Sequence, residues 1–362
     1  MDERQQRALA MKRDLDRRFF RKGLVIAILS GISYGLFTAF LNLGMDTGIW
    51  REWAGGAVSA FAVIYIVSAL GSALMYTLSA VWSLLLSAIQ GKLGDFFRSV
   101  WTKPGRQILV AALLGGPIAG TAYVIALQQA GSIVIPISAL NTAIGSVLGW
   151  ALYKQKLTPR MILGIAICFI ASLMIAGQSL LGDAPEGMAS GVFMAFVAAF
   201  GWGLEGCLAG YATSMVDYQV GITIRQLTGG VANLLIVIPA LCLAGGKGAG
   251  YGWGLLGQAL GDGPALAAFA ASGFFAMFAY SLWYKGNSMV GAALGMAASG
   301  AYSIWGPFFS WVILGLACGR EGWSIPAIGW VAAIVMIIGI FTIAMNPLDL
   351  FKKKEDRYEN AA

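Results

Sequence analysis

Long apolar runs dominate this sequence, and short polar segments separate them. A helix needs about 20 apolar residues to cross the hydrocarbon core of a bilayer, so runs of this length predict transmembrane helices. Their lengths and interruptions predict ten spans, at residues 23–44, 56–89, 106–128, 132–153, 160–180, 188–211, 219–244, 264–284, 288–316 and 324–346. The second run is long enough to tilt, to extend past the bilayer or to contain a re-entrant segment.

Composition agrees with a membrane protein and excludes several other classes. Hydrophobic residues make up 58% of the chain and charged residues 11%, whereas soluble domains carry about a quarter charged residues. The cysteines Cys168, Cys207, Cys242 and Cys318 lie in or beside apolar runs, so we expect free thiols. The absence of histidine excludes histidine proton relays and removes the most common catalytic metal ligand, so we expect no metal and no cofactor.

The basic residues are distributed unequally between alternate loops. With a cytoplasmic N-terminus, 20 of the 24 lysines and arginines fall in cytoplasmic segments, and only Arg51, Lys247 and Arg320 fall in external ones. This bias predicts ten spans with both termini cytoplasmic, in the cell membrane. Because the basic residues lie in tails and loops between apolar runs, the net charge of +7 reflects membrane topology rather than a nucleic-acid surface. We therefore expect no nucleic-acid partner.

The two halves of the chain resemble each other. The segment SGISYGLF at 30–37 matches AAFGWGLE at 198–205, which pairs Tyr34-Gly35 with Trp202-Gly203. Further on, Tyr123 matches Tyr280. These matches predict a five-helix repeat at 23–181 and a second at 188–346, flanked by a basic tail at 1–22 and a charged tail at 347–362. The apolar run after the basic tail lacks the cleavage site and short apolar region of a signal peptide, so we expect the first helix to be retained. Because five is odd, the second repeat is inverted, as in many secondary carriers.

With these motifs the sequence resembles the drug/metabolite transporter superfamily with its EamA-type repeat. The matching residues are the aromatic-glycine pairs Tyr34-Gly35 and Trp202-Gly203 and the basic loop Lys156-Leu157-Thr158 before the fifth span. Gln155 and Thr142 depart from the Glu and Pro that the family often has there. The resemblance covers about residues 23–346 and implies an all-α membrane protein of ten transmembrane helices in two inverted repeats that moves a small solute.

Charged residues inside the bilayer are costly, and each one is therefore a candidate functional residue. Glu205 and Arg225 qualify, and helical rise places both about 9 Å inside the membrane from the cytoplasmic side. They can pair as a fixed tie between two helices, or snorkel independently. Alternatively, Glu205 receives a substrate cation or a coupling proton, and Arg225 acts as the counter-charge or binds a substrate carboxylate.

Aromatic residues are the other candidate lining of a binding pocket. Trp202 lies one turn from Glu205, Tyr34 is its repeat mate, and Tyr280, Tyr302 and Trp305 lie in spans eight and nine. Such rings can hold an organic cation, whereas an interfacial belt is the alternative, and it suits Trp283 and Tyr284 near the predicted membrane edge better. The polar residue Asn141 completes the predicted substrate-binding set, although its side chain can also hydrogen-bond between helices.

The pattern favours a secondary carrier that works by alternating access, with a small-molecule substrate and a coupling proton or cation. No Walker A motif is present, so ATP is not its direct energy source. A membrane-embedded enzyme is one alternative, but the chain lacks paired intramembrane carboxylates and a G-x-S-x-G motif, so we expect no enzyme. A non-transporting receptor or scaffold is the other alternative. The sequence is compatible with a monomer or a homodimer.

Overall fold

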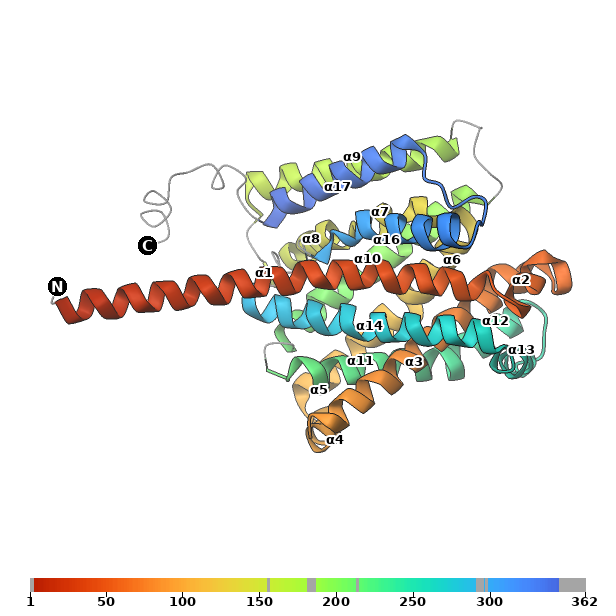
Figure 1. The fold of residues 1–362 in the computed structure, drawn as a ribbon, viewed down its shortest axis with the longest axis horizontal. Coiled ribbons are helices and arrows are strands. Elements are labelled where there is room, and N and C mark those ends of the chain that lie inside the picture. Colours follow the sequence, from red (N-terminus) through yellow and green to blue (C-terminus); the bar gives the residue numbers. More distant parts are fainter. Residues whose placement is uncertain are drawn as a thin grey trace.

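The computed structural model describes residues 3–154, 157–180, 187–212, 215–290, 296 and 299–344. Every regular element in these ranges is helical, and the helices lie alongside one another in a bundle (Figure 1). The first helix, α1 (Glu3–Met45), begins within the basic segment and extends beyond the bundle (Figure 1). From Glu3 the predicted tail is therefore helical and continuous with the first span, whose apolar part begins at Arg18.

Six helical segments within the described ranges are long and apolar enough to cross a membrane. They are Arg18–Met45, Ala62–Ile89, Lys103–Ser138, Met188–Ala209, Tyr218–Ala244 and Gly263–Val290. Three shorter apolar helices cover Pro159–Met174, Tyr302–Ala317 and Ala327–Ile343. Because a lipid-exposed backbone must satisfy its own hydrogen bonds, this helical architecture suits a hydrocarbon environment. The chain is an all-helical protein with the features of a membrane-embedded one.

The long second run begins with a break and continues as one helix. The short helix α2 (Ile49–Glu52) continues into the π-helical turn η1 (Trp53–Ala57), which ends where Gly56 takes a φ of 108°. After this break, η2 (Ala62–Val67) and α3 (Ser68–Ile89) form one helix. The glycine conformation, which other residues rarely adopt, therefore shortens the predicted span at its start.

The third span is bent by a π-helical turn. Helix α5 (Lys103–Leu113) starts with Thr102, whose hydroxyl accepts a hydrogen bond from the Gly105 amide at 3.2 Å. It continues through η3 (Leu114–Gly120), which contains Pro117, into α6 (Thr121–Ala130). Proline lacks the amide hydrogen that an α-helix needs at this position, which accounts for the irregular turn.

The remaining predicted spans differ from the structure in their limits. The fourth is interrupted after α7 (Ile135–Ser138) and resumes as α8 (Asn141–Tyr153). The eighth, α14 (Gly263–Val290), continues past the predicted end at 284, and its Lys285 lies with Nζ 5.0 Å from the centroid of the Tyr218 ring.

The other helices are η4 (Gly131–Val134), α4 (Leu93–Val100), α9 (Pro159–Leu180), α10 (Met188–Ala212), α11 (Tyr218–Ala232), η5 (Asn233–Val237), α12 (Ile238–Ala244), α13 (Tyr251–Leu260), α16 (Tyr302–Ser310), η6 (Trp311–Ala317) and α17 (Ala327–Ala344).

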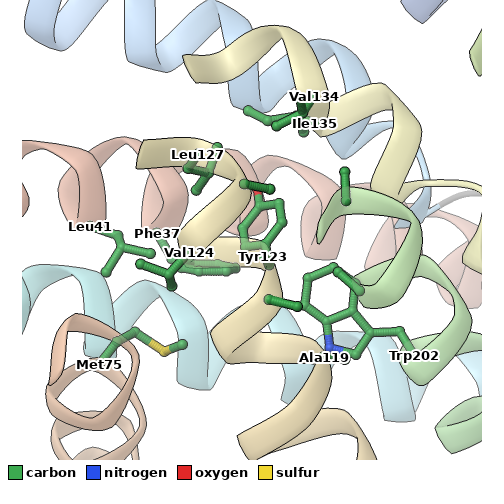
Figure 2. Packing of buried hydrophobic residues seen from close by; sticks show 14 of the residues in the cluster. Phe37, Leu41, Met75, Ala119, Tyr123, Val124, Leu127, Val134, Ile135 and Trp202 are labelled. Atoms are coloured by element: carbon green, nitrogen blue, oxygen red, sulfur yellow. The ribbon is translucent and has the colours of Figure 1, made fainter. Parts of the chain in front are cut away.

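Helices from the two halves of the chain pack against each other. Helix α1 contacts α14 and α16, α10 contacts α8 and the α5–α6 helix, and α3 contacts α11. Helices α9 and α17 lie side by side at one edge of the bundle (Figure 1). Figure 2 shows the centre of the bundle, where Tyr123 of α6 lies between the side chains of α1 and Trp202 of α10.

Candidate functional site

A buried ion pair lies at the centre of the bundle. Arg225 of α11 contacts Glu205 of α10 through Nε and Oε1 at 2.5 Å and donates from Nη2 to Oε2 at 2.8 Å. Neither side chain is exposed. The remaining guanidinium nitrogen, Nη1, donates to Oε1 of Gln226 at 2.9 Å. This two-point arrangement is the strongest geometry for an arginine and a carboxylate, and it fixes both side chains.

The ring of Tyr280 covers the face of the same guanidinium. The Arg225 guanidinium carbon lies 3.8 Å from the ring centroid of Tyr280 and 5.6 Å from that of Tyr76. A cation at this distance from an aromatic face is attracted by the ring. Arg225 is therefore held by a carboxylate, an amide and two aromatic rings.

A glycine in the π-helical turn η3 lets Glu205 reach this position. A methyl group on Gly115 would lie 1.7 Å from Oε2 of Glu205, so a larger residue requires the carboxylate to move. The Gly115 carbonyl accepts hydrogen bonds from Nε1 of Trp202 at 2.9 Å and from the Tyr76 hydroxyl at 3.3 Å. Such π-helical turns are frequent at functional sites, and this one positions the carboxylate and the neighbouring indole.

Polar contacts between α3 and α11 lie along the helix that carries the arginine. Gln226 donates to Ser79 at 2.6 Å, and Gln219 donates to the Ser83 carbonyl at 3.3 Å. Nearer the α4 end, the hydroxyls of Ser87 and Thr223 share a hydrogen bond of 3.0 Å. Polar contacts of this kind hold helices together in lipid, so they fix the helix that carries Arg225.

Aromatic rings from both halves of the chain pack together next to the ion pair. The Tyr34 ring stacks on that of Tyr302 with centroids 4.1 Å apart, and it meets the Trp202 ring edge to face at 6.0 Å. The Tyr123 ring lies 5.0 Å from that of Trp202, and Figure 2 shows the two rings beside each other. The buried hydroxyls of Tyr34 and Tyr280 have no hydrogen-bond partner among the described residues.

These groups enclose a central pocket with a cavity of about 40 Å³. One water molecule needs roughly 10–15 Å³ on this measure, so an organic solute requires the walls to separate. The pocket is lined by Ser30, Tyr34, Asn141, Trp202, Glu205, Arg225, Ala279, Tyr280, Trp283, Met296, Ser299, Gly300 and Tyr302.

Seven of the eight predicted substrate-binding residues line this pocket: Glu205, Trp202, Tyr34, Arg225, Tyr302, Tyr280 and Asn141. Trp305 does not, since its ring stacks on that of Phe309 at 5.7 Å. Trp283 also lines the pocket, although its position near the predicted end of the span favours an interfacial role. Its neighbour Tyr284 is 2% exposed and is a core residue rather than part of an interfacial belt.

Ion pairs join the two halves of the chain at each end of the bundle. At the α2 end, Asp46 lies 3.2 Å from Arg320 and 3.9 Å from Arg51. Burial raises the pKa of the Asp46 carboxyl above its usual value of 3.8, and the Arg51 charge opposes this rise. At the α4 end, Lys92 contacts Asp217 at 2.9 Å. Asp217 also begins α11 by accepting a hydrogen bond from the Gln219 amide at 3.0 Å.

Comparisons with known proteins identify neither a family nor a named relative. No protein-family profile matches the chain, and no curated protein matches it. A solved structure titled only "Crystal structure of protein" superposes with a TM-score of 0.49 at 19% identity, over 90% of this chain and 99% of the other. The fold and the site alone define the class: in its described residues the chain has the all-helical, apolar character of a membrane protein, with a buried ion pair in an aromatic pocket.

Proposed function

We propose that this chain is a secondary carrier of a small organic solute, built from two inverted five-helix repeats and related to the EamA-type drug/metabolite transporters. The observation that carries the proposal is the Glu205–Arg225 pair in an aromatic pocket between helices of both halves. Charged groups this deep in a membrane protein usually serve a solute or ion pathway. Midplane sites between repeats are typical of secondary carriers.

Equivalent contacts of the two aromatic-glycine pairs support the inverted repeat. A methyl group on Gly35 would lie 2.6 Å from the Trp305 carbonyl carbon, in the ninth predicted span. A methyl group on its repeat mate Gly203 would lie 3.0 Å from the Asn141 carbonyl oxygen, in the fourth. Spans four and nine are themselves repeat mates, so each glycine brings the first helix of one repeat against the fourth helix of the other.

The aromatic residue of each pair has an equivalent role in the proposal. Tyr34 and Trp202 both line the pocket, and their rings lie 6.0 Å apart. The glycine lets the helices approach, and the preceding ring then projects between the repeats. The two motifs thus contribute one wall of the proposed solute site.

The ion pairs at the two ends support alternating access. Asp46–Arg320 and Lys92–Asp217 each join a residue of one half to a residue of the other. Rocking of one repeat against the other requires such contacts to open in turn. In this proposal they are the outer and inner closures of the solute path.

A ligand screen followed by flux measurement tests the proposal. Purified protein is screened by thermal shift against small metabolites, since a ligand at about 100 times its Kd adds roughly 2.7 kcal/mol of stability. Each stabilising compound is then offered in radiolabelled form to proteoliposomes. Saturable uptake of at least one of them, competed by excess unlabelled compound, is expected. Stabilisation without uptake in either direction contradicts a carrier and favours a receptor.

A further inference from the structure

The charges of the central pocket compensate each other. Glu205 and Arg225 are the charged side chains that line it among the described residues. Both carboxylate oxygens are occupied by the guanidinium, and Nη1 is occupied by Gln226. The pocket therefore has no net charge and no uncompensated charge to attract an ion.

A solute with a net charge is disfavoured in such a pocket. It would either bring an unpaired charge into a buried site or separate the existing pair, and both steps carry a large desolvation cost. The ring face of Tyr280, a natural surface for an organic cation, is already covered by Arg225 at 3.8 Å. A molecule without net charge can bind with every charge in the pocket still paired.

The remaining groups of the pocket favour a polar head on an apolar body. The hydroxyls of Tyr34 and Tyr280 are buried without hydrogen-bond partners, and each can donate to or accept from a ligand. The wall around them consists largely of the rings of Tyr34, Trp202, Trp283 and Tyr302. Apolar walls with a few placed polar groups are typical of small-molecule sites.

We propose that the solute has zero net charge: a neutral or zwitterionic molecule with an apolar body, whose polar head hydrogen-bonds to Tyr34 and Tyr280. This inference rests on the proposed function, because it takes the central pocket as the solute site. A zwitterion fits the same condition as a neutral molecule, since its ammonium beside Glu205 and its carboxylate beside Arg225 would leave every charge in the pocket with an opposite partner.

Four probes that share a phenyl body but differ in charge test the net charge that the pocket prefers in its solute. They are phenylalanine, 3-phenylpropanamide, 3-phenylpropylamine and 3-phenylpropionate, which are zwitterionic, neutral, cationic and anionic at pH 7. Their Kd values for the purified protein are compared by thermal shift and calorimetry. We expect phenylalanine or the amide to bind at least about tenfold more tightly than both ions, a difference of roughly 1.4 kcal/mol. Tightest binding of the amine or the acid overturns the inference, as does the absence of binding by all four.

Two variants test whether the preferred probe binds in the central pocket. Tyr280→Phe keeps the ring beside Arg225 but removes the hydroxyl, so the preferred probe should bind roughly fivefold more weakly, as one neutral hydrogen bond predicts. Trp305→Phe is the matched control, because its ring lies against Phe309 outside the pocket, and it should leave all four affinities unchanged. Equal weakening by both variants places the probe elsewhere and contradicts the assignment.

The outcome also separates this inference from the proposed function. Tighter binding of phenylalanine or 3-phenylpropanamide without flux in proteoliposomes leaves the net-neutral site intact and removes the carrier. Flux that is fastest for a cationic or anionic probe retains the carrier and removes the net-neutral site.

Discussion

Arg225 on α11 binds both carboxylate oxygens of Glu205 on α10, at 2.5 and 2.8 Å, with neither side chain exposed to solvent. The pair thereby ties together two neighbouring helices of the second half. It also lines a pocket whose other wall comes from the first half, through Tyr34 and Asn141. The same two residues thus tie two helices together and line the pocket proposed as the solute site.

Removing one member of the pair should destabilise the fold far more than removing both. Arg225→Met or Glu205→Leu alone leaves a buried unpaired charge, at a cost of about 3–5 kcal/mol. The double variant Glu205→Leu/Arg225→Met replaces the pair by apolar groups of similar size and should be close to wild type. Thermal unfolding and monodispersity in detergent measure this. If the double variant instead loses as much stability as the two single variants together, the two residues do not stabilise the fold as a pair.

Gly115→Ala should disturb the pair from outside it. The added methyl group would lie 1.7 Å from Oε2 of Glu205, so the carboxylate must leave its contact with Arg225 or the helix must shift. We expect a lower unfolding temperature and loss of ligand binding. Gly257→Ala in α13 is the control, because nothing lies within 4 Å of its added methyl group. That change should be neutral or stabilising by roughly 0.5–1 kcal/mol.

The central charges and part of the aromatic wall were predictable from sequence, since an intramembrane charge or a repeated aromatic-glycine pair is visible without coordinates. Glu205, Arg225, Tyr34 and Trp202 are brought together as these patterns suggested. The contribution of Gly115 was not predictable, because it depends on the π-helical turn around Pro117. No local pattern indicates which helix that turn approaches.

Side-chain direction explains the other differences between the predicted and the observed lining of the pocket. Trp305 lies one turn after Tyr302, yet its ring packs on Phe309 while the Tyr302 ring stacks on Tyr34. Trp283 near a predicted membrane edge lines the pocket, because α14 continues to Val290. Helical spacing defines a face, whereas rotation against neighbouring helices is set by close contacts such as Gly35 on Trp305.

Asp46 should give stability a measurable pH dependence. Its pKa is raised in the folded protein, so the folded state takes up its proton at higher pH than the unfolded state. By linkage, the cost of its buried charge is present at neutral pH and disappears as pH falls through the raised pKa. The unfolding temperature of Asp46→Asn minus that of wild type should therefore be largest near pH 7.5 and decrease toward pH 4.5. A difference that grows on acidification would mean that the ion pairs with Arg51 and Arg320 dominate.

The charge bias of the loops predicts the orientation in the membrane. In a cysteine-free background, Lys247→Cys should react with an impermeant thiol reagent in intact cells, and Lys103→Cys should react only after permeabilisation. Both follow from 20 of the 24 basic residues lying on the side predicted to be cytoplasmic. Protection at position 247 with labelling at position 103 would reverse the topology.

The flux of the double variant Glu205→Leu/Arg225→Met in proteoliposomes decides whether the ion pair belongs to the solute site. A solute that stabilises the wild-type protein is used, and wild type, Trp305→Phe and the double variant are reconstituted at equal density after each is shown to be monodisperse. If the pair belongs to the solute site, the double variant folds but transports at background level, and Trp305→Phe retains wild-type uptake. Full uptake by the double variant would contradict the account and leave Glu205 and Arg225 as a tie between α10 and α11.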